Sequence, residues 1–308
     1  MFNLEIFNSI FLKIITNLLS VLIGFLAGRY YGVQRDSIGQ LLFYFFAPIV
    51  FFSSPASSKL NISNISVTFI MFFICSCNAI FCYYALKKFW TDNARNILSM
   101  SAGSSNCGYF MLPIASILFD ETNLNIYMML VIGVALYESS IGYYICAKNI
   151  VSTKESIKRI LTLPMFNAFV FGVLFSISGL HLPGFLKDFT QNMRSAYSIL
   201  GMTMIGLGLS GVKSISIDYR FTGFALLIKL IIQPLGIILF VLLDYFIFKL
   251  YDAMFYKAMI LISTAPVAAN TIVMANIANF SVEKVATIVF ISAILSLIYI
   301  PTIVSFLI

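Results

Sequence analysis

Charged side chains are scarce in this chain. Only 10% of its 308 residues are Asp, Glu, Lys or Arg, while 60% are hydrophobic; an average soluble domain has about 25% charged residues. A water-soluble chain of this composition would expose large apolar patches and aggregate, so the composition predicts a membrane protein. The net charge is +7, but the basic residues are spread thinly between apolar runs, which argues against nucleic acid as a partner.

Histidine is almost absent, and this limits catalysis. His181 is the single histidine, and no HExxH, paired-carboxylate or Ser/His/Asp pattern occurs at a usable spacing. We therefore expect no enzyme activity, no cofactor and no metal site. The five cysteines fall in or beside apolar segments, where we expect them to act as small hydrophobic groups.

Apolar segments long enough to cross a bilayer fill most of the chain. A helix needs about 20 apolar residues to span the hydrocarbon core. Ten segments qualify: 8–28, 37–55, 63–86, 95–119, 124–147, 160–179, 192–212, 221–248, 256–277 and 284–308. The sequence thus predicts an all-α polytopic protein with ten transmembrane helices in the inner (plasma) membrane. The longest connection lies near 148–159.

The distribution of Lys and Arg predicts the orientation in the membrane. Twelve of the 19 basic residues lie in the loops after the first, third, fifth, seventh and ninth segments, and five lie in the other loops. Because basic loops stay in the cytoplasm, this count predicts that both termini are outside and that the 148–159 loop is inside.

Corresponding features in the two halves predict an internal repeat. Pro113 and Pro266 lie in the fourth and ninth segments, and the 148–159 loop falls near the midpoint. We therefore divide the chain into a first five-helix repeat, 1–150, and a second, 151–308. Five is odd, so the second repeat is inverted in the membrane, an arrangement typical of secondary transporters.

The fourth and ninth segments carry residues that weaken a helix. They contain GSSNCGYFMLP at 103–113 and STAPVAAN at 263–270. Glycine and proline disfavour a continuous helix, and backbone groups freed at bilayer depth must face protein or a wet cavity. The N-termini of the half-helices would favour an anion, and Asn106 and Asn270 would add neutral donors and acceptors. A proline-kinked helix packed through small residues is the alternative, but the matched pair favours a transport site.

The same residues resemble a known family. NCGYFMLPIASILF is similar to the fourth-helix motif of the auxin efflux carrier family, in which Asn-x-Gly precedes a proline. APVAANTIVMANIANF is similar to its C-terminal motif, and LIKLIIQPLGIIL to its eighth-helix segment. The resemblance extends over the ten predicted helices, and the short central loop is similar to that of bacterial members.

The resemblance implies a fold similar to the bile acid–sodium symporters. In that fold the scaffold and transport domains are interleaved from both halves, the broken fourth and ninth helices cross in the transport domain, and substrates are small organic anions. It implies a homodimer through scaffold helices. It also implies a substrate-binding site at Asn106, Gly108, Pro113, Pro266 and Asn270.

Two ionisable residues fall inside predicted spans. Glu138 lies near the middle of 124–147, where a carboxylate costs about 2.5 kcal/mol or more. It is a candidate for proton coupling or for contact with the substrate, and the alternative is a structural hydrogen bond from a protonated Glu138 to a neighbouring helix. Lys229 either reaches the cytoplasmic interface or presents a fixed positive charge to the broken helices. No acidic residue lies in the two broken helices, which favours H+ over Na+ as the coupling ion, with a uniporter as the alternative.

Small residues recur in GMTMIGLGLSG at 201–211. No predicted strand precedes this stretch, so a phosphate-binding loop lacks its context. The stretch predicts close packing of this helix against a neighbour.

These features together predict a secondary active transporter (permease) of a small organic anion, in particular a carboxylate, that works by alternating access. The alternative is a membrane sensor or regulatory binding protein of the same fold without net transport. No soluble domain is recognisable, which argues against a sensor.

Overall fold

The computed structural model describes residues 3–58, 62–147, 162–211 and 217–307. All regular elements in these ranges are helices, which confirms the predicted all-helical class. Six are long and apolar enough to cross a membrane: Leu4–Tyr31, Arg35–Ala56, Asn64–Lys88, Glu121–Cys146, Tyr219–Phe248 and Val282–Phe306. Pro164–Ile177 and Ala253–Ser263 are shorter apolar helices.

Each of the ten predicted segments contains helical residues, several of them in more than one piece. In chain order the elements are α1 (Leu4–Tyr31), α2 (Arg35–Leu41), η1 (Leu42–Phe46), α3 (Ala47–Ala56), α4 (Ile62–Ala85), η2 (Leu86–Lys88), α5 (Ala94–Ser101), α6 (Leu112–Leu118), α7 (Glu121–Tyr137), η3 (Glu138–Gly142), α8 (Tyr143–Cys146), α10 (Pro164–Ile177), α11 (Gly184–Ser210), α12 (Tyr219–Leu227), η4 (Ile228–Ile232), α13 (Gln233–Leu243), η5 (Asp244–Phe248), α14 (Ala253–Ser263), α15 (Asn270–Ile277) and α16 (Val282–Leu307). Since six of these helices meet the length and hydropathy of a span, ten crossings and the inverted repeat stay predictions. The 148–159 loop lies outside the described residues.

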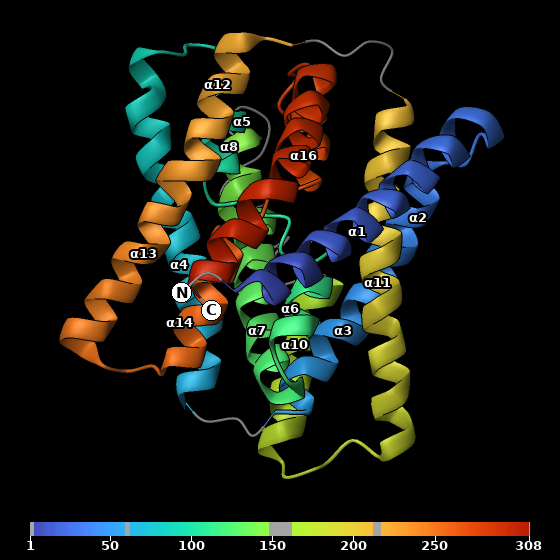
Figure 1. Cartoon of the computed structure of the whole chain (residues 1–308), viewed down its shortest axis with the longest axis vertical. Coiled ribbons are helices and arrows are strands. Elements are labelled where there is room, and N and C mark those ends of the chain that lie inside the picture. Colours follow the sequence, from blue (N-terminus) through green and yellow to red (C-terminus); the bar gives the residue numbers. More distant parts are fainter. Residues whose placement is uncertain (1–2, 59–61, 148–161, 212–216, 308) are drawn as a thin grey trace.

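The helices pack in two groups (Figure 1). In the first, α1 runs along α11, α3 runs along α10, and α2 and η1 contact α11; we call this the α1–α11 group. In the second, α4 runs along α7, α14 contacts α7 and α13, and α15 contacts α16. Together with α5, which contacts α4 and α8, the segment that follows α5, and η3 and α8, which continue α7, we call this the α4–α7 group. The two groups touch where α1 meets α16 and α3 meets α7.

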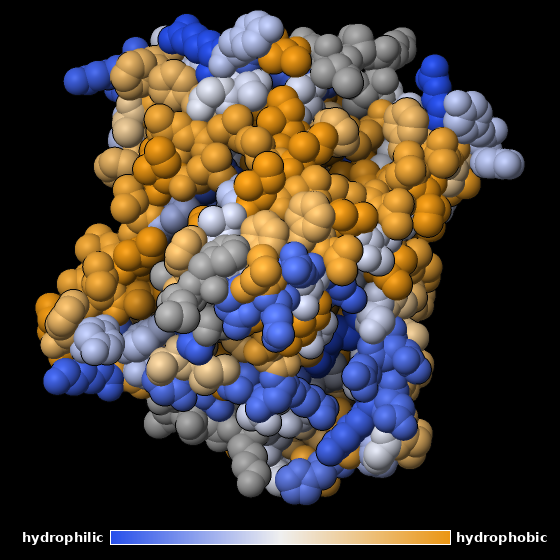
Figure 2. Space-filling model, in the orientation of Figure 1, coloured by the Kyte–Doolittle hydropathy of each residue, from blue (hydrophilic) through white to orange (hydrophobic). Residues whose placement is uncertain are grey.

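Large apolar side chains cover much of the outer surface. Ile23 on α1, Phe73 on α4 and Leu239 on α13 are each about 60% exposed, and Figure 2 shows a broad hydrophobic region with hydrophilic residues above and below it. Exposed apolar area on this scale marks a surface that meets lipid.

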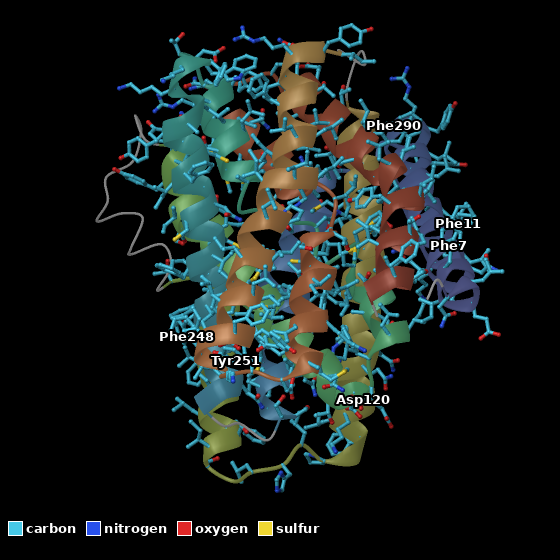
Figure 3. All side chains as sticks on the ribbon, turned by 60° about the vertical axis from the view of Figure 1, so that its left-hand side comes forward. Phe7, Phe11, Asp120, Phe248, Tyr251 and Phe290 are labelled. Carbon is cyan, nitrogen blue, oxygen red and sulfur yellow. The ribbon has the colours of Figure 1, made fainter. Side chains whose placement is uncertain are left out.

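Side-chain caps fix the starts of several helices. Asp120, labelled near the lower end of the molecule in Figure 3, accepts a hydrogen bond from the backbone N–H of Asn123 at the start of α7 over 2.8 Å. Asn3, Asp218 and Asp252 cap α1, α12 and α14 in the same way. A side-chain oxygen at this position binds an N–H group that has no partner inside the helix.

One predicted boundary is wrong. The segment predicted at 192–212 is part of α11, which begins eight residues earlier, at Gly184. The additional turns contain Lys187, Asp188 and Gln191. A boundary set by hydropathy excludes such polar residues from a membrane span even where they are helical. Pro183 precedes the first turn, where its missing N–H costs nothing.

Glycines allow α1 and α11 to approach closely. A Cβ atom on Gly24 would lie 2.0 Å from the carbonyl oxygen of Thr203, and one on Gly206 would lie 1.9 Å from that of Val21. Both distances are far inside van der Waals contact, so only glycine fits. This confirms the close packing predicted for 201–211.

Both predicted interruptions are present. Residues 102–111 separate α5 from α6, and residues 264–269 separate α14 from α15. In addition, η1, η3, η4 and η5 are π-helical turns, in which one extra residue is accommodated per turn. The sequence pattern did not predict these turns. Glu138 opens η3, and Lys229 is the second residue of η4.

Three of the loops predicted to be cytoplasmic lie together. Arg220, at the start of α12, donates to the carbonyl of Phe89, just after η2, over 2.7 Å. Lys284, at the start of α16, pairs with Asp218 over 2.7 Å. The basic loops therefore gather at one end of the molecule, and the side of the membrane that this end faces stays a prediction.

Candidate functional site

The two interrupted segments are in direct contact. The backbone N–H of Asn106 donates to the carbonyl of Pro266 over 3.0 Å. Next to this contact, the N–H of Val267 donates to the hydroxyl of Ser292 on α16 over 3.1 Å. Backbone groups freed from the helix at membrane depth must find protein partners, and these bonds supply them.

The α1–α11 group also binds the first interruption. Ser198 on α11 donates to the carbonyl of Tyr109 over 2.6 Å, and Asn17 on α1 donates to the carbonyl of Phe110 over 3.0 Å. Both side chains are buried. The segment between α5 and α6 therefore lies at the contact between the two helix groups.

Glu138 is buried and hydrogen-bonded to the first interruption and to the residue that follows the second. It is 6% exposed. One carboxyl oxygen accepts from the hydroxyl of Ser104 over 2.5 Å, and the other accepts from the side-chain amide of Asn270 over 2.9 Å. The carboxyl group thus connects the segment before α6 with the first residue of α15.

Lys229 is buried behind the first interruption. It is 1% exposed, and its ammonium group donates to the carbonyl of Ser104 over 2.8 Å, to the hydroxyl of Ser105 over 2.7 Å, and to the side-chain carbonyl of Gln233. Gln233 in turn donates to the hydroxyl of Ser105 over 2.5 Å. The alternative in which Lys229 reaches the membrane interface is therefore wrong, because the amine is fixed to the broken helix instead.

A cavity of about 530 Å³ lies between the two helix groups. Its walls from the α1–α11 group include Arg35, Phe43, Tyr44, Phe51 and Tyr197. Its walls from the α4–α7 group include residues 105–109, Glu138, Tyr143 and residues 268–270. Both interruptions and the buried carboxyl group therefore face one cavity.

The predicted site residues divide into two sets. Asn106, Gly108, Asn270 and Glu138 line the cavity. Pro113, Pro266 and Lys229 are not part of its walls. Their roles in binding or coupling stay predictions.

The three residues outside the cavity wall have clear local positions. Pro113 lies in the first turn of α6, where proline is compatible with a helix. Pro266 offers its carbonyl to Asn106. The start of α15 borders the cavity through residues 268–270, but the first residues of α6 do not. The sequence predicts that the N-termini of both half-helices face one site. The N-terminus of α15 faces the cavity, but that of α6 does not.

The side-chain amides of the two asparagines already have protein partners. The Asn106 side-chain oxygen accepts from the N–H of Phe110 over 3.3 Å, and the Asn270 amide nitrogen donates to Glu138. Their capacity to bind a further molecule is therefore only partial.

Several residues of the cavity wall were missed by sequence reasoning. The sequence assigns Arg35 only to a basic loop, and for the helix that carries Tyr197 it predicts only close packing through small residues. Tyr109 lies inside the GSSNCGYFMLP motif itself, and its ring centre is 4.8 Å from that of Tyr197. An arginine at the start of a predicted span was the one available signal for Arg35.

Thiols and metal ligands contribute little to the site. All five cysteines are free, and four of them are buried; of these, Cys107 lines the cavity. Within the part of the chain that the structure describes, no group of three or more His, Cys, Asp or Glu residues could hold a metal ion.

The sequence matches a known protein family. A family model described as "Membrane transport protein" matches residues 149–304, which is half of the chain. No curated protein matches the sequence. The matched half contains Lys229, Pro266 and Asn270, whereas the first interruption and Glu138 precede it.

Proposed function

The chain belongs to the membrane transport protein family, which is the auxin efflux carrier family, and from this premise we propose that it is a secondary active transporter of a small organic anion, in particular a carboxylate. It is a multi-pass membrane protein of a transporter family. We propose no catalytic role for it.

The observation that carries the proposal is the cavity between the two helix groups. One wall belongs to the α1–α11 group, and the other contains both interrupted helices. A movement of one group against the other would expose this cavity first to one side of the membrane and then to the other, which is alternating access. A volume of about 530 Å³ suits a small molecule.

The proposed architecture follows from the same division. The α1–α11 group would be the scaffold and the α4–α7 group the transport domain, as in the bile acid–sodium symporters. The interrupted helices would cross at the bond between Asn106 and Pro266, and 1–150 and 151–308 would be inverted repeats. We propose the inner (plasma) membrane as the location, both termini outside, and a homodimer through the scaffold.

Glu138 is the proposed proton-coupling group. It is the acidic side chain that touches the first interruption, through Ser104, and the residue that follows the second, Asn270. Protonation would remove its ability to accept from both donors at once, so its charge state would change the contact between the two segments. Lys229 would provide a fixed positive charge close by.

Reconstitution tests the proposal. The purified full-length chain is incorporated in liposomes, and uptake of radiolabelled carboxylates is measured under imposed pH and sodium gradients. We expect saturable uptake that responds to the pH gradient and is indifferent to sodium. Empty liposomes and liposomes with heat-denatured protein are the controls.

Two outcomes would contradict parts of the proposal. Specific binding without flux of any carboxylate would favour the sensor or regulatory binding protein instead of a transporter. Uptake that follows the sodium gradient and ignores the pH gradient would exclude Glu138 as a proton-coupling group.

A further inference from the structure

Arg35 is a half-buried cation that makes no ion pair within 4 Å in the described part of the chain. It is the first residue of α2 and lines the cavity. Within residues 3–58, 62–147, 162–211 and 217–307, a single ion pair has its charged atoms within 4 Å of each other. It joins Lys284 to Asp218 and does not involve Arg35. Asp36, the next residue in the chain, does not come within this distance of the guanidinium. Asp36 also lines the cavity, but a half-buried guanidinium without a direct ion pair loses hydration that this more distant carboxylate restores only in part.

The guanidinium lies against a bare part of α11. A Cβ atom built on Gly208 would be 3.5 Å from Nε of Arg35 and 3.6 Å from its Cζ. Because Gly208 has no side chain, the helix offers neither a hydrogen-bond acceptor nor a steric block at this point. The planar donors of Arg35 are therefore available to a molecule in the cavity.

The other polar groups of the cavity are poorly suited to an anion. Asn270 already donates to Glu138, and the side chain of Asn106 accepts from Phe110. A carboxylate placed at Asn270 would also lie next to the Glu138 carboxyl group, and two carboxylates in one site repel each other when both are ionised.

Among the described residues that line the cavity, Arg35 is the one cationic side chain, and Asp36 and Glu138 are the acidic ones. Arginine binds a carboxylate through two parallel N–H donors, which is stronger and more directional than a contact with a neutral amide. The charge distribution of the cavity therefore directs an anionic group toward α2, away from the interrupted helices.

We propose that Arg35 binds the anionic group of the substrate and that the interrupted helices bind its uncharged part. With one cation in the wall, the site would prefer a singly charged anion to a doubly charged one. The aromatic rings of Tyr109, in the first interruption, and of Tyr197, on α11, would contact the apolar body. The inference rests on the proposed function for its substrate, but it concerns binding and is tested apart from transport.

Two pairs of matched variants isolate the charge. Arg35→Gln removes the positive charge, and Arg35→Lys keeps it. Gly208→Asp introduces an internal counter-ion beside the guanidinium, and Gly208→Asn introduces a side chain of the same size without charge. The added Cβ of either Gly208 variant is in ordinary van der Waals contact with Arg35, at 3.5 Å from its Nε.

Binding is measured on the purified full-length protein in detergent, by the rise in unfolding temperature with ligand concentration. The probes are benzoate with one charge, phthalate with two and benzamide with none. We expect wild type to bind benzoate best and Arg35→Gln and Gly208→Asp to lose about tenfold or more in apparent affinity for it, as expected when a charged hydrogen bond is lost. Arg35→Lys and Gly208→Asn should lose much less, and benzamide should not distinguish the variants.

The inference is overturned if Arg35→Gln and Gly208→Asp bind benzoate as wild type does, if wild type binds phthalate or benzamide as well as benzoate, or if none of the probes stabilises wild type. Uptake in liposomes separates this result from the proposed function. Carboxylate flux with unchanged Arg35→Gln kinetics would overturn the inference and leave the transporter standing. Binding that depends on Arg35, without carboxylate flux, would support the inference about Arg35 and contradict the proposed transport function.

Discussion

Glu138 and Lys229 hold the same residue of the interrupted segment through different atoms. Glu138 accepts from the hydroxyl of Ser104, and Lys229 donates to the carbonyl of Ser104. The two charged groups come from η3 and η4, which belong to different helices. The position of the segment before α6 therefore depends on both, and a change in one is transmitted to the other through one residue.

Replacing Glu138 with Gln should remove the pH dependence of transport. Gln can still accept from Ser104, but it carries no proton that is exchanged during the cycle. The NH2 group of the new Gln side chain would face the NH2 group of Asn270, two donors that cannot bond to each other, unless the Asn270 side-chain amide rotates by 180°. The measurement is uptake in liposomes at several imposed pH gradients. Glu5→Gln, an exposed carboxyl group on α1, is the control, and a pH response in Glu138→Gln equal to that of wild type would exclude the coupling role.

Replacing Lys229 with Met should lower stability substantially. The change removes an ammonium group with three buried hydrogen bonds, and loss of one member of a buried polar set costs roughly 3 kcal/mol. Thermal unfolding in detergent measures the effect. Lys249→Met, at an exposed position, should change the unfolding temperature little, and equal behaviour of the two variants would contradict the structural role of Lys229.

The two asparagines should both matter for transport, for different reasons. Asn270→Ala leaves one oxygen of Glu138 without its donor, whereas Asn106→Ala leaves the N–H of Phe110 without its acceptor. The bond from the Asn106 backbone to Pro266 remains in either case. We expect lower uptake in both variants, with wild-type rates in Asn8→Ala, an exposed position on α1. Wild-type transport kinetics in both Asn106→Ala and Asn270→Ala would show that neither asparagine side chain contributes to the transport site.

Gly206→Ala should destabilise the packing of α1 on α11. The new methyl group would lie 1.9 Å from the carbonyl oxygen of Val21, so the helices must separate, at a cost of about 1–3 kcal/mol. A Cβ on Gly223 of α12 meets nothing within 4 Å, and Gly223→Ala should be neutral or slightly stabilising. A Gly206→Ala protein that unfolds at the wild-type temperature would contradict the close approach.

Acid should weaken the contact between the starts of α12 and α16. The hydrogen-bonded ion pair with Lys284, together with the N–H of Phe221, holds the pKa of Asp218 below its usual range. The stabilisation is therefore complete above the unfolded-state pKa, near 3.8, and is lost as pH falls through the lower folded-state value. Both partners are partly exposed, so the ion pair contributes only about 0.2–1 kcal/mol.

The matched pair Asp218→Asn and Asp252→Asn measures this contribution. Both residues cap a helix, and the described part of the chain shows an ion pair for Asp218 but not for Asp252. Stability measured from pH 7 to pH 3 should fall more steeply for wild type than for Asp218→Asn, and Asp252→Asn should follow wild type. Parallel curves for wild type and Asp218→Asn would refute the assignment.

Composition and helix-weakening residues predicted the main features of the fold. Scarce charge and long apolar segments indicated the all-helical membrane class, and Gly103, Pro113 and Pro266 marked the two interruptions. These are local properties that each segment carries in its own sequence. The close packing of 201–211 was predictable for the same reason, since small residues permit close approach whichever helix is the partner.

The arrangement of the site depended on contacts that no single segment encodes. Lys229 looked equally suited to the interface and to the interior, and only the position of Ser104 and Ser105 beside η4 decides between them. Arg35 looked like a loop charge because the sequence does not show that α2 and α11 form a cavity wall. Likewise, the π-helical turns depend on the contacts that each helix makes with its neighbours. The spacing of apolar residues along the sequence cannot distinguish a π turn from an α-helix.

Three of the four π-helical turns also indicate where the chain can become shorter. Deleting one residue from an α-helix turns everything after it by about 100°. A π turn holds one residue more than an α turn, so a deletion there restores ordinary helix and leaves the faces on both sides as they were. Helix continues on both sides of Leu42–Phe46, Glu138–Gly142 and Ile228–Ile232, whereas Asp244–Phe248 ends its helix. A scan of single-residue deletions should therefore find tolerated positions in the first three turns, while deletions inside α4 or α7 should abolish folding.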